Sequence, residues 1–306
     1  MFKHILVPLD GSLMAEAALP TAALLARKAG AALTLIHVIE KNAPSAVHND
    51  RHLVTAEEAA TYLDGLARRP PLAGLAVATH VHTAEVRDVA RSITAHSDEL
   101  APDIVVMTAH GTGGARRLFS GAIAQQVVGH GLTPVLLVHL AGGAPEAAAG
   151  RAPAGTWTSI LAPIDGDPSH EKSLPIAADL AAAFGCRLHL LMVTHTSASL
   201  AGTDHATETL LPGATRVKLE MESAAAGDYL AARVRELSSE GIETGSEASR
   251  GDPARAIIKA ARRIGPDLVV MATHGRAGAG AFFEGSVAAR VVARARASLL
   301  LVPVKE

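Results

Sequence analysis

The amino-acid sequence predicts an α/β protein built from two tandem, doubly wound sheets, each with five parallel strands in the order 3-2-1-4-5. Three observations predict this fold. The chain repeats itself, each repeat alternates short apolar runs with longer segments of helical periodicity, and the apolar residues are almost all aliphatic. Hydrophobic residues make up 49% of the 306 residues, whereas aromatic residues make up only 3%. Cores of Ala, Val, Leu and Ile are typical of parallel strands covered by helices.

The internal repeat is visible at two constant offsets. Residues 4–11 read His-Ile-Leu-Val-Pro-Leu-Asp-Gly, and residues 159–166, which lie 155 positions later, read Ser-Ile-Leu-Ala-Pro-Ile-Asp-Gly. Further along the chain the offset becomes 164, where Pro-Asp-Ile-Val-Val-Met at 102–107 matches Pro-Asp-Leu-Val-Val-Met at 266–271. Such self-similarity indicates a duplicated domain. The change of offset predicts about nine extra residues between the second strand and the third helix of the second copy.

The segment 141–155 separates the two copies. It consists mainly of Ala, Gly and Pro and has no apolar period, which is typical of a flexible linker. We therefore expect a first domain at 1–140, a linker at 141–155 and a second domain at 156–306.

Each copy alternates predicted strands and helices. In the first copy we expect strands near 4–9, 32–38, 74–82, 103–108 and 134–139, and helices near 12–29, 53–68, 86–99 and 121–131. In the second copy we expect strands near 158–163, 187–193, 242–249, 267–272 and 298–303, and helices near 169–184, 215–239, 253–264 and 285–296. Strict alternation predicts parallel sheets whose ligands bind beyond the carboxyl ends of the strands, where the strand order reverses. Pro20 and Pro175 predict a kink in the first helix of each copy.

Composition excludes several classes of partner. The 28 basic and 30 acidic residues leave a net charge of −2, so the chain has no overall charge to attract nucleic acid or an anionic membrane. The single cysteine, Cys186, excludes an intramolecular disulfide and fits a small buried residue better than a reactive thiol. No secretory signal and no apolar stretch of about 18 residues is present. We expect a soluble cytoplasmic protein.

Acidic residues follow the first strand of each copy, at Asp10 and Asp165. An Asp that leaves a buried strand can cap the following helix. It can equally accept hydrogen bonds from a ribose or an adenine. The two roles do not exclude each other.

The fourth strand of each copy ends in a His-Gly pair, followed after nine residues by a glycine that begins a helix. Glycines let the backbone approach a ligand, and a helix N-terminus favours an anion. Ser286 can cap its helix or hydrogen-bond a phosphate. The pattern is neither a P-loop nor Gly-x-Gly-x-x-Gly, and taken alone it is also typical of an ordinary turn.

Five features occur together: the strand-one Pro-x-Asp-Gly, the His-Gly, the nine-residue spacing, the Gly-Ser and the closing Pro-Val-Leu-Leu-Val at 134–138. As a set they resemble the universal stress protein family. The resemblance covers both copies. It implies a Rossmann-like fold of the adenine nucleotide alpha hydrolase type. It also implies binding of ATP, AMP or ADP, with Mg²⁺ as a candidate companion ion. In nucleotide-binding members the strand-one Asp and the end of strand two hold the adenosine, and the glycine loop holds the phosphates.

Carried over by position, the resemblance implies one fuller site and one degenerate site. The nucleotide-binding residues of the second copy would be Pro163, Ile164, Asp165, Val193, Met271, His274, Gly275, Gly285, Ser286 and Val287. The degenerate site of the first copy would contain Asp10, Val38, His110, Gly111 and Gly121. The first glycine of the motif is Ala272 in the second copy and Thr108 in the first. Ala122 also replaces the hydroxyl of Ser286, which removes a phosphate hydrogen bond of about 1 kcal/mol. We therefore expect nucleotide to favour the second copy.

No catalytic residue and no metal site is predicted. His110 and His274 would lie beside the phosphates, but no carboxylate-paired base or nucleophile accompanies them. His80 and His82 share one face of a predicted strand, and His48 and His52 are four residues apart, but no further motif completes a metal site.

The sequence thus predicts a stress-response module that binds an adenine nucleotide and is not primarily an enzyme. One alternative, favoured by the two replaced glycines, is a nucleotide-free sensor or scaffold that binds another small molecule or a protein. Another is a slow ATPase, which would need an ordered metal and a base. Family domains pair through their last strands, so the resemblance implies a pseudo-dimer within the chain through Val135–Val138 and Leu299–Val302. Other faces would remain available for a homodimer.

Overall fold

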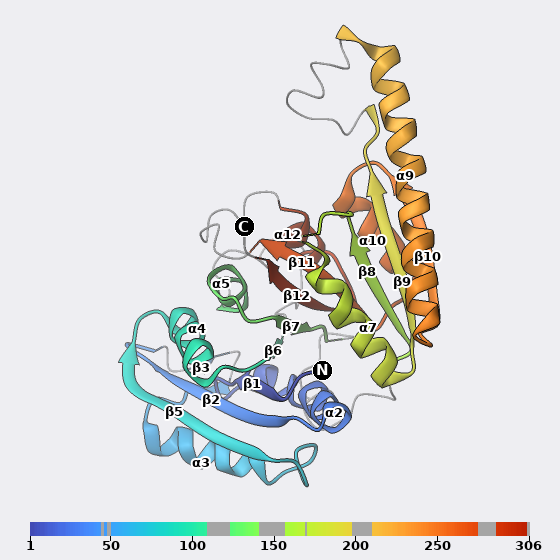
Figure 1. Ribbon diagram of the computed structural model, residues 1–306. Helices are drawn as coiled ribbons and strands as arrows, with labels where there is room; N and C mark the ends of the chain where they lie inside the picture. The colour runs from blue at the N-terminus through green and yellow to red at the C-terminus, as the bar shows by residue number, and fades with distance from the viewer. Residues whose placement is uncertain are drawn as a thin grey trace. The chain divides into compact units, whose positions relative to one another are not determined.

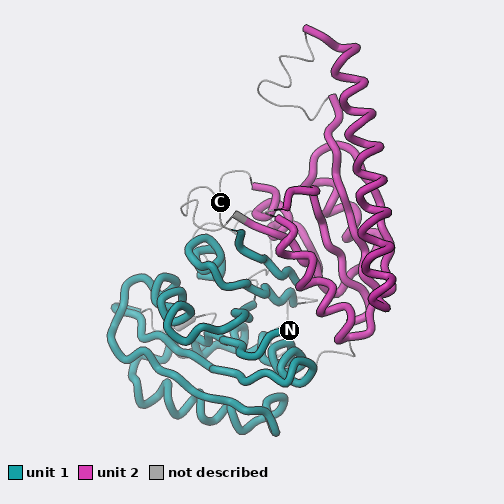
Figure 2. The backbone as a smooth tube through the Cα atoms, in the orientation of Figure 1, with its two compact units in different colours: residues 1–156, 274–284, 298–305 teal, residues 157–273, 285–297, 306 magenta. Residues whose placement is uncertain are grey.

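The chain folds into two compact units, which Figure 2 distinguishes by colour. Unit 1 comprises 1–156, 274–284 and 298–305, and unit 2 comprises 157–273, 285–297 and 306. The computed structural model describes residues 1–43, 46, 47, 50–108, 123–140, 157–168, 170–197, 210–274 and 286–304. The last strand of the chain, which is the fifth strand of the second copy in sequence, therefore belongs to unit 1 by its contacts.

Unit 1 contains the whole first copy of the fold (Figure 1). Its strands are β1 (His4–Pro8), β2 (Ala32–Glu40), β5 (Val77–Val86), β6 (Ile104–Thr108), β7 (Val135–Val138) and β12 (Ser298–Val304), with a small hairpin of β3 (Ala46–Val47) and β4 (Asp50–Arg51). Its helices are α1 (Leu13–Glu16), α2 (Leu19–Ala29), α3 (Ala56–Ala67), α4 (Val89–Leu100) and α5 (Ile123–His130). The parallel strands lie in the order β5-β2-β1-β6-β7. This is the predicted order 3-2-1-4-5.

Unit 2 repeats this arrangement. Its strands are β8 (Ser159–Ile164), β9 (Arg187–Thr194), β10 (Thr244–Arg250) and β11 (Leu268–His274), parallel and in the order β10-β9-β8-β11. Its helices are the 3₁₀ helix η1 (His170–Lys172), α7 (Ser173–Phe184), α9 (Pro212–Ser239), α10 (Pro253–Ile264) and α12 (Val287–Val292). Helix α9 has 28 residues, against 12 in its counterpart α3. The predicted α/β class with two copies is confirmed.

The cores are aliphatic, as the composition predicts. Ile5, Leu6 and Leu33 are fully buried in unit 1, and Ile160 and Leu161 are fully buried in unit 2. Continuous apolar strands of this kind need helices on both faces, and Figure 1 shows α3 and α4 on opposite sides of β2 and β5.

The single cysteine is part of this apolar interior. Cys186 is buried, and burial together with the nearby charge of Asp267 raises the pKa of its thiol to about 11. A thiol with such a pKa stays protonated and unreactive near neutral pH.

The first helix of each copy departs from the prediction. Instead of one kinked helix, α1 ends at Glu16 and α2 begins at Leu19, with Pro20 in its first turn. In unit 2, η1 precedes α7, and Pro175 lies in the first turn of α7. A proline is tolerated there because the amide of a first-turn residue has no intrahelical acceptor. Both prolines therefore start a helix rather than bend one.

The strand β12 pairs with β7 in antiparallel orientation. Leu299 lies opposite Leu137, Leu300 opposite Leu136, and Leu301 opposite Val135. The backbone amide of His139 also donates a hydrogen bond to the Ser298 hydroxyl at 3.2 Å. The two last strands are thus hydrogen-bonded to each other within unit 1. Among the described helices, none has the length and apolar character that crossing a membrane requires.

Candidate functional site

The first and fourth strands of unit 1 are paired only near their beginnings. The ladder between β1 and β6 contains two residue pairs, Ile5 with Ile104 and Leu6 with Val105, although both strands continue further. The amide of Leu9 donates to Ile36 on the β2 side at 2.8 Å. The backbone N–H groups of successive residues in a strand point alternately to its two neighbouring strands, so the backbone of residue 8 faces β6. Because proline has no N–H, Pro8 cannot donate a hydrogen bond to β6. The ladder therefore ends where a doubly wound sheet binds its ligand.

Unit 2 has the same feature. The ladder between β8 and β11 contains the pairs Ile160–Leu268 and Leu161–Val269, and Pro163 stands at the position of Pro8. The adjacent strand β9 stays paired with β8 up to Ile164 opposite Met192. Continuing this register by one residue places Asp165 beside Val193, within the last two residues of β9.

A pocket lies at this edge of unit 1. Its empty space is about 660 Å³, including the part that is open to solvent. Asp10 and Val38 of the predicted degenerate site line it, together with Met107 and Thr108 at the end of β6. His110, Gly111 and Gly121 lie outside the described residues. The structure therefore brings together those members of the first-copy site that it describes.

Asp10 closes a tight turn after β1. Its Oδ1 accepts hydrogen bonds from the Ser12 amide at 2.9 Å and from the Ser12 hydroxyl at 2.6 Å. The Ser12 hydroxyl in turn accepts from the Ala15 amide at 3.2 Å and caps α1. Of the two roles open to Asp10, capping of the helix falls to Ser12 instead, and Asp10 holds the capping serine.

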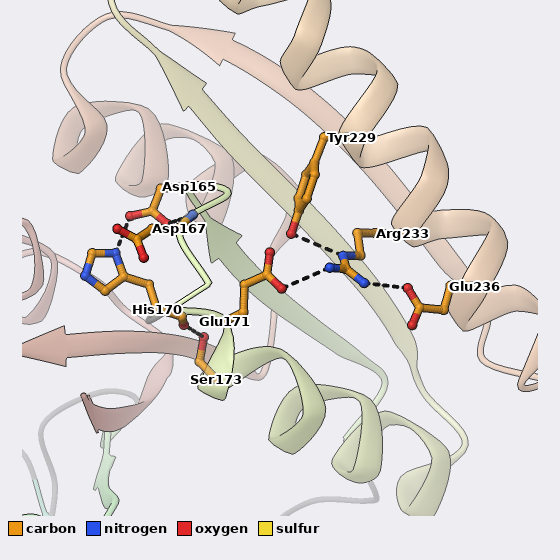
Figure 3. A network of polar contacts seen from close by, with 8 residues as sticks. All are labelled: Asp165, Asp167, His170, Glu171, Ser173, Tyr229, Arg233 and Glu236. Carbon is orange, nitrogen blue, oxygen red and sulfur yellow. Dashed lines mark hydrogen bonds and ion pairs between the residues drawn. The ribbon is translucent and has the colours of Figure 1, made fainter. Parts of the chain in front are cut away.

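The turn after β8 is built alike, but its acid has a further partner. Oδ1 of Asp165 accepts from the Asp167 amide at 3.0 Å, as Oδ1 of Asp10 does from Ser12. Oδ2 of Asp165 lies 2.5 Å from Nδ1 of His170, within hydrogen-bond distance, as Figure 3 shows. The residue of the first copy at the position of His170 is Ala15, which lines the unit 1 pocket. The strand-one acid is therefore covered by an imidazole only in unit 2.

A polar network lies next to this imidazole. Glu171, the neighbour of His170, accepts from Arg233 of α9 at 3.0 Å (Figure 3). The same guanidinium donates to Glu236 at 2.7 Å and to the Tyr229 hydroxyl at 3.1 Å. The hydrogen bond to Glu236 is the main reason why the pKa of Arg233 is raised. The helix η1 is thus anchored to α9.

The predicted phosphate side of unit 2 is described in part. Met271 is buried in β11, and only the backbone of His274, the last residue of that strand, is described. Gly275 and Gly285 lie outside the described residues. The Ser286 hydroxyl accepts from the Ala289 amide at 3.1 Å and caps α12, whose first residue is Val287. The capping role of Ser286 is confirmed, and phosphate binding stays a prediction.

The sequence analysis did not single out a carboxylate–guanidinium pair beside this helix. Asp252 caps α10 by accepting from the Arg255 amide at 2.9 Å. Its carboxylate also accepts from the guanidinium of Arg290, in α12, at 2.6 and 2.8 Å. That hydrogen bond is the main reason why the pKa of Asp252 is lowered. The Asp-Pro that starts a helix is a recognisable cap signal, but no sequence pattern announces its distant arginine.

Two histidines of the unit 1 pocket were not predicted as site residues, since His37 was not singled out and His52 was considered only as a metal ligand. His37 is 1% exposed, and its two ring nitrogens lie 2.7 Å from the Leu9 carbonyl and 3.3 Å from the Leu53 carbonyl. Burial lowers the pKa of His37, against the effect of these two carbonyls. His52 is 6% exposed, and its Nδ1 has no hydrogen-bond partner among the described residues. A histidine inside the apolar run of strand two was the available signal for His37.

A separate histidine cluster joins β5 to α4. Nε2 of His96 lies 3.0 Å from Nδ1 of His82, and the ring centroids of His80 and His96 are 4.7 Å apart. Nδ1 of His96 lies 3.2 Å from the Glu99 carboxylate. Within the described parts of the chain, no group of three or more His, Cys, Asp or Glu residues is arranged to hold a metal ion.

This cluster predicts acid sensitivity. Burial, followed by the neighbouring His80 and His82, lowers the pKa of His96 below its ordinary value of 6.5. The unfolded chain therefore takes up this proton first, so stability is full above about pH 6.5 and falls as the pH drops below it. We expect His96→Phe, which keeps a ring in this place, to reduce the loss of stability between about pH 7.5 and about pH 5.5. Urea unfolding at a series of pH values measures this, and an unchanged pH dependence would contradict it.

Comparisons with known proteins agree with this architecture. The profile of the Universal stress protein family matches residues 1–139 and 156–303. The solved structure of a universal stress protein from Archaeoglobus fulgidus DSM 4304 is 15% identical, with a TM-score of 0.68 over 98% of this chain and 96% of that chain. A functionally unknown protein, PA1789, from Pseudomonas aeruginosa PAO1 is 17% identical, with a TM-score of 0.65 over 99% and 93%. At these identities the likeness shows the fold alone. No curated protein sequence matched the chain.

Proposed function

Because this chain belongs to the universal stress protein family, as a tandem member, we propose that it is a stress-response module that binds an adenine nucleotide in its second copy. The observation that carries the proposal is the short ladder between β8 and β11, which ends at Leu161 and Val269. The sheet order reverses between these strands, and ligands of doubly wound sheets bind at such a point.

The residues at this edge suit the two ends of a nucleotide. Asp165 and Val193 end neighbouring strands and would hold the adenosine, with Pro163 and Ile164 beneath it. The chain from Met271 to Gly275 and the start of α12 at Gly285, Ser286 and Val287 would hold the phosphates of ATP, AMP or ADP. Mg²⁺ would accompany a polyphosphate.

One observation favours a nucleotide-free sensor as the second candidate. Oδ2 of Asp165, which a ribose would use, already lies 2.5 Å from His170. A nucleotide would have to displace this imidazole or hydrogen-bond to the pair. Ala272, which replaces the first glycine of the motif, also favours the nucleotide-free sensor.

Calorimetry with ATP tests the proposal with a matched pair of variants. Asp165→Ala should weaken ATP binding roughly 10- to 100-fold, since a hydrogen bond to a charged group contributes about 1.5–3 kcal/mol. Asp10→Ala makes the same change in the first copy and should leave ATP binding unchanged. No binding by the intact chain would leave the sensor as the function. An equal loss in both variants would contradict the assignment to the second copy.

We propose in addition that the two copies form a pseudo-dimer through their last strands. The pairing of β7 with β12 supports this arrangement. Other faces would then remain available for a homodimer.

A further inference from the structure

The pocket of unit 1 differs in chemistry from a nucleotide site. We propose that it is a second, independent ligand site for a small uncharged or cationic molecule that donates a hydrogen bond to His52, and that it rejects phosphorylated ligands. Its empty space is about 660 Å³, part of which is open to solvent, and its wall combines apolar side chains with a few polar groups, as small-molecule sites do. The proposal does not depend on nucleotide binding in the second copy.

The unpartnered nitrogen of His52 is the first argument. Its side chain lines the pocket and is 6% exposed, and Nδ1 has no hydrogen-bond partner among the described residues. A buried polar atom without a partner costs about 1–3 kcal/mol. A ligand that supplies the missing partner recovers this free energy. His52 lines the pocket, so a ligand that reaches this buried nitrogen would supply its missing partner.

The surroundings of His52 decide which role Nδ1 plays. The other ring nitrogen, Nε2, lies 4.0 Å from the Glu40 carboxylate. In the neutral ring, a proton on Nε2, which faces the carboxylate, leaves the lone pair on Nδ1, and Nδ1 then accepts a hydrogen bond. The complementary ligand group is an N–H or O–H donor.

The segment that carries His52 is fixed at the rim of the pocket. The Leu53 carbonyl lies 3.3 Å from Nε2 of His37, and the Asp50 carboxylate accepts from the Leu13 amide at 2.9 Å. One contact ties the segment to β2, and the other ties it to the start of α1. His52 is therefore positioned before a ligand arrives, which lowers the entropy cost of binding.

Charge is the second argument. Asp10 and Glu40 line the pocket, and no Lys or Arg is among the described residues that do. The remaining wall is mostly apolar, with Ile36, Val38 and Ile93 among its residues. Two carboxylates in such a pocket repel a phosphate and attract an amine.

The space beside Asp10 is the third argument. Ala15 lines the pocket in unit 1, whereas unit 2 has His170 at this position, paired with Asp165. The first copy thus keeps a small side chain where the second copy places an imidazole. The substitution Ala15→His would transfer that obstruction into unit 1.

A series of probes that differ only at the 5′ position tests the proposal. 5′-Amino-5′-deoxyadenosine, adenosine and AMP share base and sugar but carry a positive, zero and negative charge. Methyl NMR of ¹³C-methionine reads each copy separately, because Met107 lines the unit 1 pocket and Met271 belongs to unit 2. At Met107 we expect the amine to bind tightest, then adenosine, and AMP at least about tenfold more weakly than adenosine.

Two variants complete the test. His52→Phe keeps a ring but removes the acceptor, and Ala15→His fills the space, so each should reduce adenosine binding at Met107 about tenfold or more. His195→Phe, at an exposed position of unit 2, is the control and should change nothing there. The proposal is overturned if AMP binds at Met107 as tightly as adenosine, if no probe shifts Met107 at millimolar concentration, or if both variants bind like the wild type. A shift at Met271 alone would support the second-copy site and refute this one.

Discussion

Replacing Leu300 with Ala is expected to lower the free energy of unfolding by about 3 kcal/mol, which lies within the range for a buried leucine. Leu300 and its partner Leu136 are each 1% exposed and lie opposite each other in the antiparallel pair of β12 and β7. Removing the side chain leaves a cavity against Leu136, because a close-packed interior relaxes only in part.

The substitution should destabilise a part of the structure that is distant in sequence. β12 ends the chain, but it is part of unit 1 and pairs with a strand near 135–138. Hydrogen–deuterium exchange should therefore rise in β7, far from the substitution in sequence. Leu190→Ala removes an equally buried leucine from β9 of unit 2 and serves as the control. Equal exchange of β7 in the two variants would show that the pairing does not stabilise unit 1.

Replacing Asp252 with Ala is expected to cost about 2 kcal/mol, through two losses. The first is the cap of α10, which is typically about 1 kcal/mol. The second is the hydrogen-bonded pair with Arg290, for which about 1 kcal/mol is reasonable at a half-buried site with two short contacts. The variant also leaves the Arg290 guanidinium without this partner.

The first copy offers a control with only one of these losses. Asp88 caps α4 by accepting from the Arg91 amide at 2.9 Å, but Gln126 stands where the second copy has Arg290. Asp88→Ala should therefore cost about 1 kcal/mol, the cap alone. Urea unfolding of both variants measures the difference. Equal losses would mean that the Arg290 pair adds no stability.

The larger loss should also depend on pH. The pKa of Asp252 is lowered in the folded chain, chiefly by Arg290. A group with a lowered carboxyl pKa stabilises the fold above its ordinary pKa, and this contribution is lost as the pH falls through the folded value. The difference between wild type and Asp252→Ala should therefore be full near neutral pH and shrink in acid.

The positions of the strands and most helices could be predicted from the sequence because they follow from local patterns. Continuous Val, Ile and Leu runs mark the buried strands, and repetition at two offsets marks the two copies. The break after α1 was predicted as a kink, since Pro20 by itself does not say whether it bends a helix or begins one. The hairpin of β3 and β4 was missed because two-residue strands are too short to show an alternating pattern.

Only those residues of the candidate site that come directly after a strand could be predicted from the sequence. The end of the first strand in each copy gave Asp10 and Asp165, because parallel strands bring their carboxyl ends to one edge. The cover of Asp165 by His170, the pair of Asp252 with Arg290 and the unpartnered nitrogen of His52 depend on side chains that meet across different elements. No local period encodes these distances.

The sequence by itself determined a duplicated α/β fold, its aliphatic cores and the edge of each sheet where a ligand would bind. Only the tertiary structure decided that the last strand joins unit 1, that an imidazole covers the acid of one copy, and that the other copy keeps a pocket. The reason is physical. The pattern of apolar residues can be read from neighbours in the chain and predicts which segments form strands and helices. Strand pairing, side-chain packing and ion pairs join residues that only the folded topology brings together.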